Sequence, residues 1–447
     1  MVNRLRTLTG SARIWLTLAP LALGAVQALQ GQASAAFAAG HDHQGKERPV
    51  PERLPEKPSI PPTLTIPVEP LGFSAPGPIY LGQRWTFASL DFLDENRLLF
   101  TFRVPGLMHR EASGEGGDER QIRAVVLALP EGTVTAEALW TVHDRVRYLW
   151  MLKDGHFLLR DRDGLQQGNA ALDLKPLLHF PGPLLWMEMD PSQQYLVTSS
   201  REPAEAEQKP GDVSSPPTAQ ASMTVDGEKH GAPDFVVRIL RRDSGQVMLV
   251  SRTRAAVHLP INSDGYVESL RGNGEQWMMN LNYFTGGSTI LGRVNSTCPP
   301  NIDFISQREL LVTACENLGA HKLVAMGIDG HRLWEDPISP QAVWPLLAMA
   351  PDGSRLARET LIVGHEINAY SPLDSEDIKG QLVRVIDAAN GKVSLEAATT
   401  PTLDAGGNVA ISPSGRRVAL LNAGSLEIFD LPAPPPLADS GNGRNVH

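Results

Sequence analysis

The sequence has 447 residues, of which 42% are hydrophobic and 20% charged, and its net charge of −10 argues against a surface for nucleic acid or anionic membrane. Two cysteines exclude a disulfide-dense scaffold, a cysteine-rich zinc module and an iron–sulfur protein. The 40 glycines and 36 prolines favour many short elements joined by turns.

Residues 1–36 are expected to be a secretory signal peptide. Its positive end consists of three arginines, Arg4, Arg6 and Arg13. The apolar run at 14–26 (IWLTLAPLALGAV) is too short to span a bilayer, and Ala33-Ser34-Ala35 matches the small-residue cleavage pattern. We therefore expect a periplasmic or secreted protein with no membrane span after cleavage. An N-terminal anchor that is never cut is the alternative.

Residues 37–61 form a polar, Pro-rich segment, which predicts a disordered linker of extended chain. His41 and His43 flank an aspartate in it, and we expect these imidazoles to be solvated rather than to hold a metal. Residues 433–447 (APPPLADSGNGRNVH) are expected to be a disordered tail. The folded part of the chain is therefore expected between residues 62 and 432.

A degenerate repeat fills this region. Its unit is an apolar run, a short turn rich in Gly, Pro, Asp or Ser, and a second apolar run, as in NVAISPSGRRVALLN (408–422). The last apolar residue before the turn marks seven copies, at Phe92, Met151, Met189, Leu270, Phe304, Met349 and Ile411. A second hairpin follows several copies, as in LVRVIDAANGKVSLEA (382–397). Two hairpins make a four-stranded antiparallel unit that must stack on its neighbours, which predicts an all-β, seven-bladed β-propeller.

The two ends of the repeat region predict how the ring closes. The seventh unit supplies only three strands, the last being SLEIFDL (425–431), whereas a lone strand-like segment at 63–68 precedes the first unit. We expect this N-terminal strand to complete the last blade, which removes exposed sheet edges. The fourth unit (270–297) is short of one strand, and six or eight blades remain alternatives to seven.

Over residues 62–432 the chain resembles the secreted bacterial propellers of the WD40-like, YVTN-like and quinoprotein-like repeat families. The resemblance rests on S-P-x-G-type turns (412–415 and 351–353) and on D-x-x-x-G-K (387–392), and it implies the fold rather than a function. No blade carries the Trp-Asp signature of true WD40 repeats. Val393 stands where quinoprotein repeats have Trp, so neither a quinone nor another cofactor is expected.

Three units carry long insertions between their second and third strands, at 106–119, 201–233 and 364–380. In a four-stranded blade these loops share one face of the ring with the blade-to-blade connections. Because loops on a rigid scaffold often carry function, we expect a protein, peptide or envelope partner to bind this face of a monomeric, non-catalytic scaffold. Alternatively the insertions are merely tolerated, since doubling a loop costs only about 0.6 kcal/mol.

Two groups of residues could carry chemistry. Cys298 and Cys315 flank the first hairpin of the fifth unit, where export permits a disulfide. Three histidines are expected in successive blade-to-blade connections that lead to the central channel, where they could converge on a metal or an anion: His143, His179 and His258. Their convergence would favour an alternative function, a metal-dependent, lactonase-like hydrolase. No catalytic residue is predicted, because motifs for a nucleophile elbow, a P-loop, a dinucleotide site or an H-E-x-x-H zinc site are absent.

Overall fold

The computed structural model describes residues 52–77, 85–105, 119–144, 146–202, 235–253, 257–316, 320–365 and 373–435. All of them belong to the unit Pro49–His447. The predicted signal peptide, residues 37–51 of the predicted linker, most of each insertion and residues 436–447 of the predicted tail lie outside the described residues.

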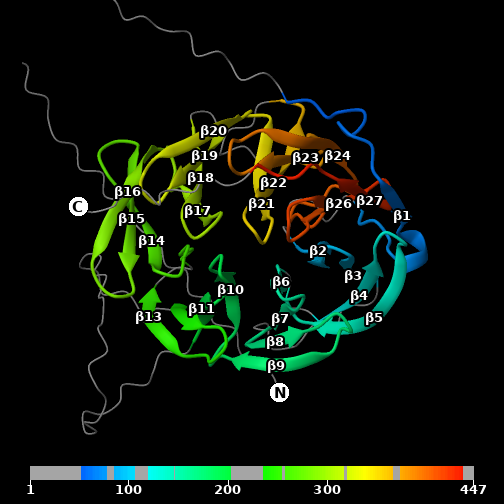
Figure 1. The fold of residues 1–447 in the computed structure, drawn as a ribbon, viewed down its shortest axis with the longest axis horizontal. Coiled ribbons are helices and arrows are strands. Elements are labelled where there is room, and N and C mark those ends of the chain that lie inside the picture. The colour runs from blue at the N-terminus through cyan, green and yellow to red at the C-terminus, as the bar shows by residue number, and fades with distance from the viewer. Residues whose placement is uncertain are drawn as a thin grey trace, which may run out of the picture. The chain divides into compact units, whose positions relative to one another are not determined.

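Seven antiparallel sheets surround a common axis, along which Figure 1 looks; in the described chain six have four strands and one has three. Blades 1 to 4 contain, in order, β2 (Ala88–Asp94), β3 (Arg97–Arg103), β4 (Arg120–Ala128), β5 (Thr133–Val142); β6 (Leu149–Met151), β7 (Phe157–Asp161), β8 (Gly164–Gly168), β9 (Leu174–His179); β10 (Leu184–Met189), β11 (Tyr195–Arg201), β12 (Phe235–Arg241), β13 (Val247–Thr253); and β14 (Gly265–Arg271), β15 (Gln276–Tyr283), β16 (Ser288–Asn295). Blades 5 to 7 contain β17 (Asn301–Phe304), β18 (Glu309–Cys315), β19 (His321–Gly327), β20 (Arg332–Ile338); β21 (Ala342–Met349), β22 (Arg355–Val363), β23 (Ile378–Asp387), β24 (Val393–Thr399); and β25 (Val409–Ile411), β26 (Arg417–Asn422), β27 (Ser425–Asp430), β1 (Leu64–Pro67). The predicted all-β, seven-bladed propeller is confirmed.

The apolar cores lie between neighbouring blades. In one of them Leu99 and Ile122 of blade 1 pack with Phe157 of blade 2, and all three side chains are almost fully buried. Burying one such side chain stabilises the fold by about 1.5–3 kcal/mol. Each sheet buries both of its faces against neighbouring blades in this way. A blade is therefore not stable alone, and closing the ring leaves no apolar face exposed.

The repeat motifs hold turns and buried charges in place. In the S-P-x-G turn, the Gly415 amide donates to the Ser412 carbonyl over 2.9 Å, and Gly415 has a φ of 69°. In D-x-x-x-G-K, Asp387 Oδ1 accepts hydrogen bonds from Arg355 Nε and Ser394 Oγ, each over 2.7 Å. Arg355 is buried, so the motif carboxylate balances an internal guanidinium.

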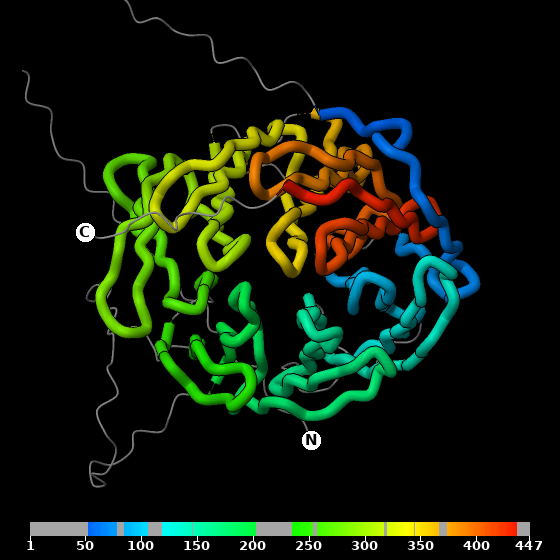
Figure 2. Tube along the Cα trace, in the orientation of Figure 1, coloured from blue at the N-terminus to red at the C-terminus, as the bar shows by residue number. Residues whose placement is uncertain are grey.

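Residues 52–77 form a strap along the outside of the ring, drawn in blue in Figure 2. Its strand β1 pairs with β27 as the fourth strand of blade 7, as predicted. Upstream of β1, the Ser59 amide donates to the Glu396 carbonyl of β24 over 2.8 Å. Downstream, Phe73 follows the short 3₁₀ helix η1 (Glu69–Leu71) and packs against Phe102 of blade 1, with ring centroids 5.5 Å apart. The strap therefore joins blades 6, 7 and 1.

The beginning of the strap is held by a buried ion-pair network. Glu52 Oε1 lies 3.0 Å from Arg358 Nη2 and 2.8 Å from Arg384 Nη1. Arg358 is fully buried and also pairs with Asp336 of blade 5 over 2.5 Å. The prediction of a disordered linker over 37–61 is therefore corrected for residues 52–61. Prolines favour an extended chain, and here that chain lies on a blade instead of projecting into solvent.

Blade 4 has three strands, and the strand it lacks is the inner one. Residues 266–280 were expected to form its first hairpin, but they form β14 and β15, its second and third strands. The inner position is occupied by residues 257–262, which form a single bridge, between Ile261 and Tyr266. The first turn of this blade therefore follows Ile261 rather than Leu270. The alternating residues of β14 and β15 around a Gly-containing turn resemble a first hairpin, which explains the error.

Candidate functional site at the propeller axis

The inner strands of blades 3 and 5 each place a carboxylate one residue before the strand ends. These residues are Glu188 in β10 and Asp303 in β17. His258 lies between them in the chain segment that occupies the inner position of blade 4. Because inner strands of a propeller converge towards its axis, residues at similar levels of these three blades become neighbours.

We call Glu188, His258 and Asp303 the axial cluster. His258 Nε2 lies 2.7 Å from Glu188 Oε2 and 3.9 Å from Asp303 Oδ1. One ligand atom from each residue lies within 4.8 Å of the other two. The side chains are 30%, 26% and 21% exposed, respectively, for His258, Glu188 and Asp303, so solvent reaches all three.

The incomplete inner edge of blade 4 allows blades 3 and 5 to approach each other. The first turn of blade 5 spans the gap, where Gln307 Nε2 donates to Asp190 Oδ2 of blade 3 over 3.0 Å. Gln307 also binds blade 4, since its Oε1 accepts from the Ser263 amide over 2.7 Å. Trp186 of β10 packs edge-on against the His258 ring, with centroids 5.1 Å apart, and holds the imidazole beside the two carboxylates.

The axial cluster has perturbed electrostatics. Burial, followed by the nearby charge of Glu188, raises the pKa of Asp303 to about 7, although His258 opposes the shift. For His258, burial lowers the pKa, but the hydrogen bond and charge of Glu188 and the charge of Asp303 outweigh it and raise the pKa overall. Two carboxylates and one imidazole thus share a confined space in which proton or cation binding relieves repulsion.

A second charged pair extends this environment towards blade 1. Burial raises the pKa of Asp91 in β2 to about 6, while a hydrogen bond from Ser89 Oγ over 2.5 Å and the charge of Arg147 lower it. The Arg147 guanidinium interacts electrostatically with both Asp91 and Glu188. The interacting ionisable groups around the axial cluster therefore include residues of blades 1 to 5.

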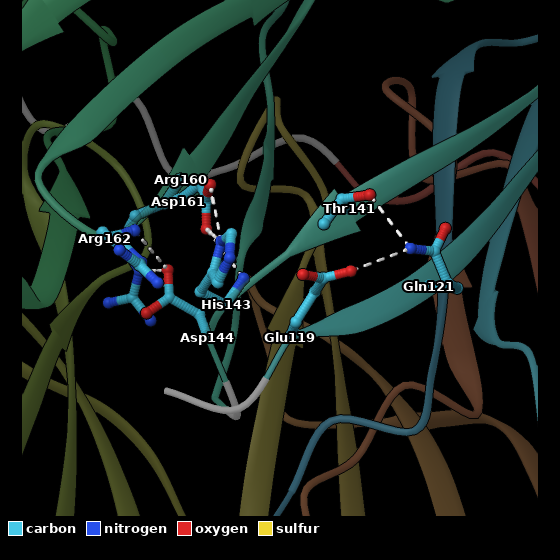
Figure 3. A network of polar contacts seen from close by, with 8 residues as sticks. All are labelled: Glu119, Gln121, Thr141, His143, Asp144, Arg160, Asp161 and Arg162. Carbon is cyan, nitrogen blue, oxygen red and sulfur yellow. Dashed lines mark hydrogen bonds and ion pairs between the residues drawn. The ribbon is translucent and has the colours of Figure 1, made fainter. Parts of the chain in front are cut away.

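The structure does not bring the three predicted histidines together. In Figure 3 the His143 amide donates to Asp161 Oδ1 over 2.7 Å, and its Nδ1 lies 3.1 Å from the same oxygen. His179 ends the outermost strand of blade 2, where its side chain is 77% exposed and lies 3.8 Å from Asp163. Of the three, His258 alone belongs to the axial cluster. The other two do not reach it because His179 belongs to the outermost strand of blade 2 rather than to a connection, and His143 is bound to Asp161 of that blade.

Cys298 and Cys315 form a disulfide with a Cα–Cα distance of 5.6 Å. Ser296 lies beside it, accepting from the Cys315 amide over 2.9 Å and donating to the Cys298 carbonyl over 2.7 Å. The bond therefore fastens the chain entering blade 5 to the end of its second strand, β18. Asp303 of the axial cluster lies between the two cysteines in sequence, five residues after Cys298.

One arginine–aromatic pair, Arg241 with Tyr195 at 5.6 Å, lies on the face of the first-to-second-strand turns. Four other pairs lie on the opposite face of the ring, which carries the second-to-third-strand loops and the blade-to-blade connections. We call this the Arg–aromatic face, and its pairs in blades 1 to 4 have guanidinium-to-ring distances of 5.2, 5.2, 5.6 and 6.0 Å: Arg120 with Trp85, Arg147 with Trp150, Arg201 with Phe235, and Arg271 with Trp277. Arg147, Arg201 and Arg271 are exposed. The sequence predicted this face as a binding surface from its loops, but no common sequence spacing links the arginines to their aromatic partners, so the pairs themselves were not predicted.

The described strand ends place the three insertions on this same face. They leave from the ends of β3, β11 and β22 and return at the starts of β4, β12 and β23. The insertions at 106–118, 203–233 and 366–372 themselves lie outside the described residues. None of the helical structure within the described residues is long and apolar enough to cross a bilayer.

No family model and no curated protein matches the sequence. Among solved structures, the acylaminoacyl peptidase of Pyrococcus horikoshii is 13% identical with a TM-score of 0.44, covering 80% of this chain and 54% of that one. The WD40 domain of Toxoplasma gondii coronin is 8% identical with a TM-score of 0.43, covering 86% of each chain. Hydrazine synthase of Kuenenia stuttgartiensis is 10% identical with a TM-score of 0.40, covering 78% of this chain and 96% of that one. The chain spans about half the length of the peptidase chain.

Proposed function

We propose that the protein is an exported, non-catalytic scaffold that binds a protein or peptide partner through its Arg–aromatic face. The observation that carries this proposal is the row of arginine–aromatic pairs on four consecutive blades. Arginine and tryptophan are enriched in protein interfaces and dominate their hot spots.

The chemistry of these pairs favours a partner that carries carboxylates. An arginine held against a ring loses little further freedom on binding, and its guanidinium presents paired N–H donors that match a carboxylate. Three such arginines are exposed on the face: Arg147, Arg201 and Arg271. The whole chain carries a net charge of −10, so an acidic partner is not attracted to the protein as a whole. The local row of arginines would instead bind an acidic segment of the partner at this face.

The closed ring suits a scaffold role. The strap contacts blades 6, 7 and 1, and its strand β1 pairs with β27, the last strand of the described chain, so the N-terminal and C-terminal parts hold each other in place. A rigid support reduces the ordering that binding requires. The disulfide between Cys298 and Cys315 supports export, because such bonds persist in oxidising compartments.

The test compares two triple variants with equal loss of positive charge. Arg147→Ala/Arg201→Ala/Arg271→Ala removes the exposed arginines of the Arg–aromatic face. The control removes three exposed arginines from the turns of the opposite face: Arg241, Arg332 and Arg416.

Each protein is probed on an array of peptides that vary in carboxylate content, and the best binders are titrated in solution. We expect the first triple variant to lose at least tenfold in affinity and the control to keep its affinity. Equal binding by the wild type and both variants would exclude this face as the docking surface.

A further inference from the structure

We infer that Glu188, His258 and Asp303 bind one divalent cation of the Zn²⁺ class at the propeller axis. The inference goes beyond the docking function and does not depend on it. It rests on the donor atoms, their separations and the charge of the axial cluster.

The donor separations bracket those of a tetrahedral site. Zn²⁺ binds imidazole nitrogen and carboxylate oxygen at about 2.0–2.2 Å, which places tetrahedral donors about 3.4 Å apart. His258 Nε2 lies 2.7 Å from Glu188 Oε2 and 3.9 Å from Asp303 Oδ1. Side-chain shifts below about 1 Å would therefore make room for the ion.

The charge of the cluster favours a dication. With a neutral imidazole the two carboxylates carry a formal charge of −2, and they come from blades 3 and 5, which the Gln307–Asp190 hydrogen bond holds together. Among the described residues no ion pair joins either carboxylate to Lys or Arg; both lie near His258, and the charge of Arg147 also acts on Glu188. A divalent ion would compensate both charges without moving either blade.

Surrounding residues orient the ligands. Trp186 packs edge-on against the His258 ring, and Asn301 Nδ2 donates to Asp303 Oδ2 over 3.0 Å, which leaves Oδ1 directed to His258. Outer contacts of this kind fix ligand direction in metal sites. Because the side chains are 21–30% exposed, an ion can enter, and a water or small ligand can reach its remaining coordination position.

The donor types separate the candidate ions. An imidazole ligand suits Zn²⁺ and similar transition ions, whereas Ca²⁺ and Mg²⁺ favour sites made of oxygen. The three protein donors leave one tetrahedral position open, as catalytic rather than structural zinc sites do. The alternative to a bound ion is a proton shared by the carboxylates and the imidazole. Metal titration distinguishes these two possibilities, because a cluster that holds only a proton takes up no stoichiometric metal.

The experiment uses the full chain with His41 and His43 replaced by Ala, so that the N-terminal histidines cannot bind added metal. The chelator-treated protein is titrated calorimetrically with ZnCl₂ and, separately, with CaCl₂. Bound metal is then counted by mass spectrometry after gel filtration. We expect one equivalent of Zn²⁺ and no saturable Ca²⁺ binding.

Four variants locate the site. His258→Ala should abolish stoichiometric binding, and Glu188→Gln and Asp303→Asn, which preserve side-chain shape, should weaken it at least tenfold. His143→Ala is the matched control, because His143 also pairs with an aspartate but lies outside the axial cluster. Thermal unfolding and circular dichroism identify any variant that fails to fold. The inference is overturned if the parent binds no stoichiometric Zn²⁺, if Ca²⁺ binds in its place, or if folded His258→Ala retains the parent affinity.

Discussion

Gln307 Nε2 donates a hydrogen bond to Asp190 Oδ2 over 3.0 Å, although the two residues belong to blades 5 and 3. Blades separated by another blade touch here because the inner edge of blade 4 is a single bridge instead of a strand. The same approach brings Glu188 and Asp303 to either side of His258. The segment that replaces the inner strand of blade 4 thus brings His258 between two carboxylates of the neighbouring blades.

Replacing Gln307 by Ala should loosen this contact. The Ser263 amide would lose its acceptor and Asp190 one of its donors, which predicts a loss of about 1–2 kcal/mol in the free energy of unfolding. Urea denaturation measures this loss, and zinc titration should show weaker binding because the carboxylates are held less firmly. Gln166→Ala in β8 of blade 2 is the control. Unchanged stability and unchanged zinc affinity in Gln307→Ala would contradict the bridging role.

Removing the Glu52 carboxylate should release the start of the strap. Arg358 is fully buried and, among the described residues, would keep Asp336 as its one acidic partner, so Glu52→Ala should destabilise the protein by about 3 kcal/mol. Denaturation midpoints measure the effect, and protease sensitivity near residue 60 should rise. Glu56→Ala, at an exposed position of the same strap, should change neither observable. Equal behaviour of the two variants would argue that the strap is not anchored by Glu52.

Breaking the disulfide should weaken blade 5. Cys298 and Cys315 are 17 residues apart, and a loop of this length contributes about 3 kcal/mol through restriction of the unfolded chain. The Cys298→Ser/Cys315→Ser variant should therefore unfold at lower temperature than the oxidised wild type. The reductant dithiothreitol should lower the wild-type melting temperature and leave that of the variant unchanged. A reductant-insensitive wild type would contradict the prediction.

The buried Glu359 should make stability depend on pH. Burial raises its pKa to about 8, although backbone donors at Gly407 and Asn408 oppose the shift, and Gln381 Nε2 donates to it over 2.9 Å. Between about pH 4.5 and 8 the folded protein therefore holds a proton that the unfolded chain releases. Its contribution to stability is complete at low pH, falls as the pH rises through this interval and is lost above about pH 8.

The Glu359→Gln variant provides the comparison, since it cannot ionise but keeps the side-chain length. We expect the stability difference between variant and wild type to shift in favour of the variant as the pH rises from 5 to 9. Urea denaturation at several pH values measures this difference. Parallel curves for the two proteins over this interval would exclude Glu359 as the titrating group.

The repeated pattern of the sequence determined the all-β fold, the number of blades and the closing strand. Alternating apolar runs around Gly-rich turns are local features, and they recur because every blade must bury both faces. The pairing of β1 with β27 was also predictable, because an incomplete last unit and a lone first strand complement each other. The register of blade 4 was predicted wrongly, because the sequences of β14 and β15 resemble the first hairpin of a unit although these strands are its second and third.

Only the tertiary structure decided which side chains meet. Glu188, His258 and Asp303 come from three blades and share no sequence spacing, so their contact depends on the convergence of inner strands and on the recessed edge of blade 4. The same holds for Glu52 and Arg358, which lie 306 residues apart. Local periodicity specifies strands and turns, whereas the distances that set charge, pKa and metal affinity arise only when the ring closes.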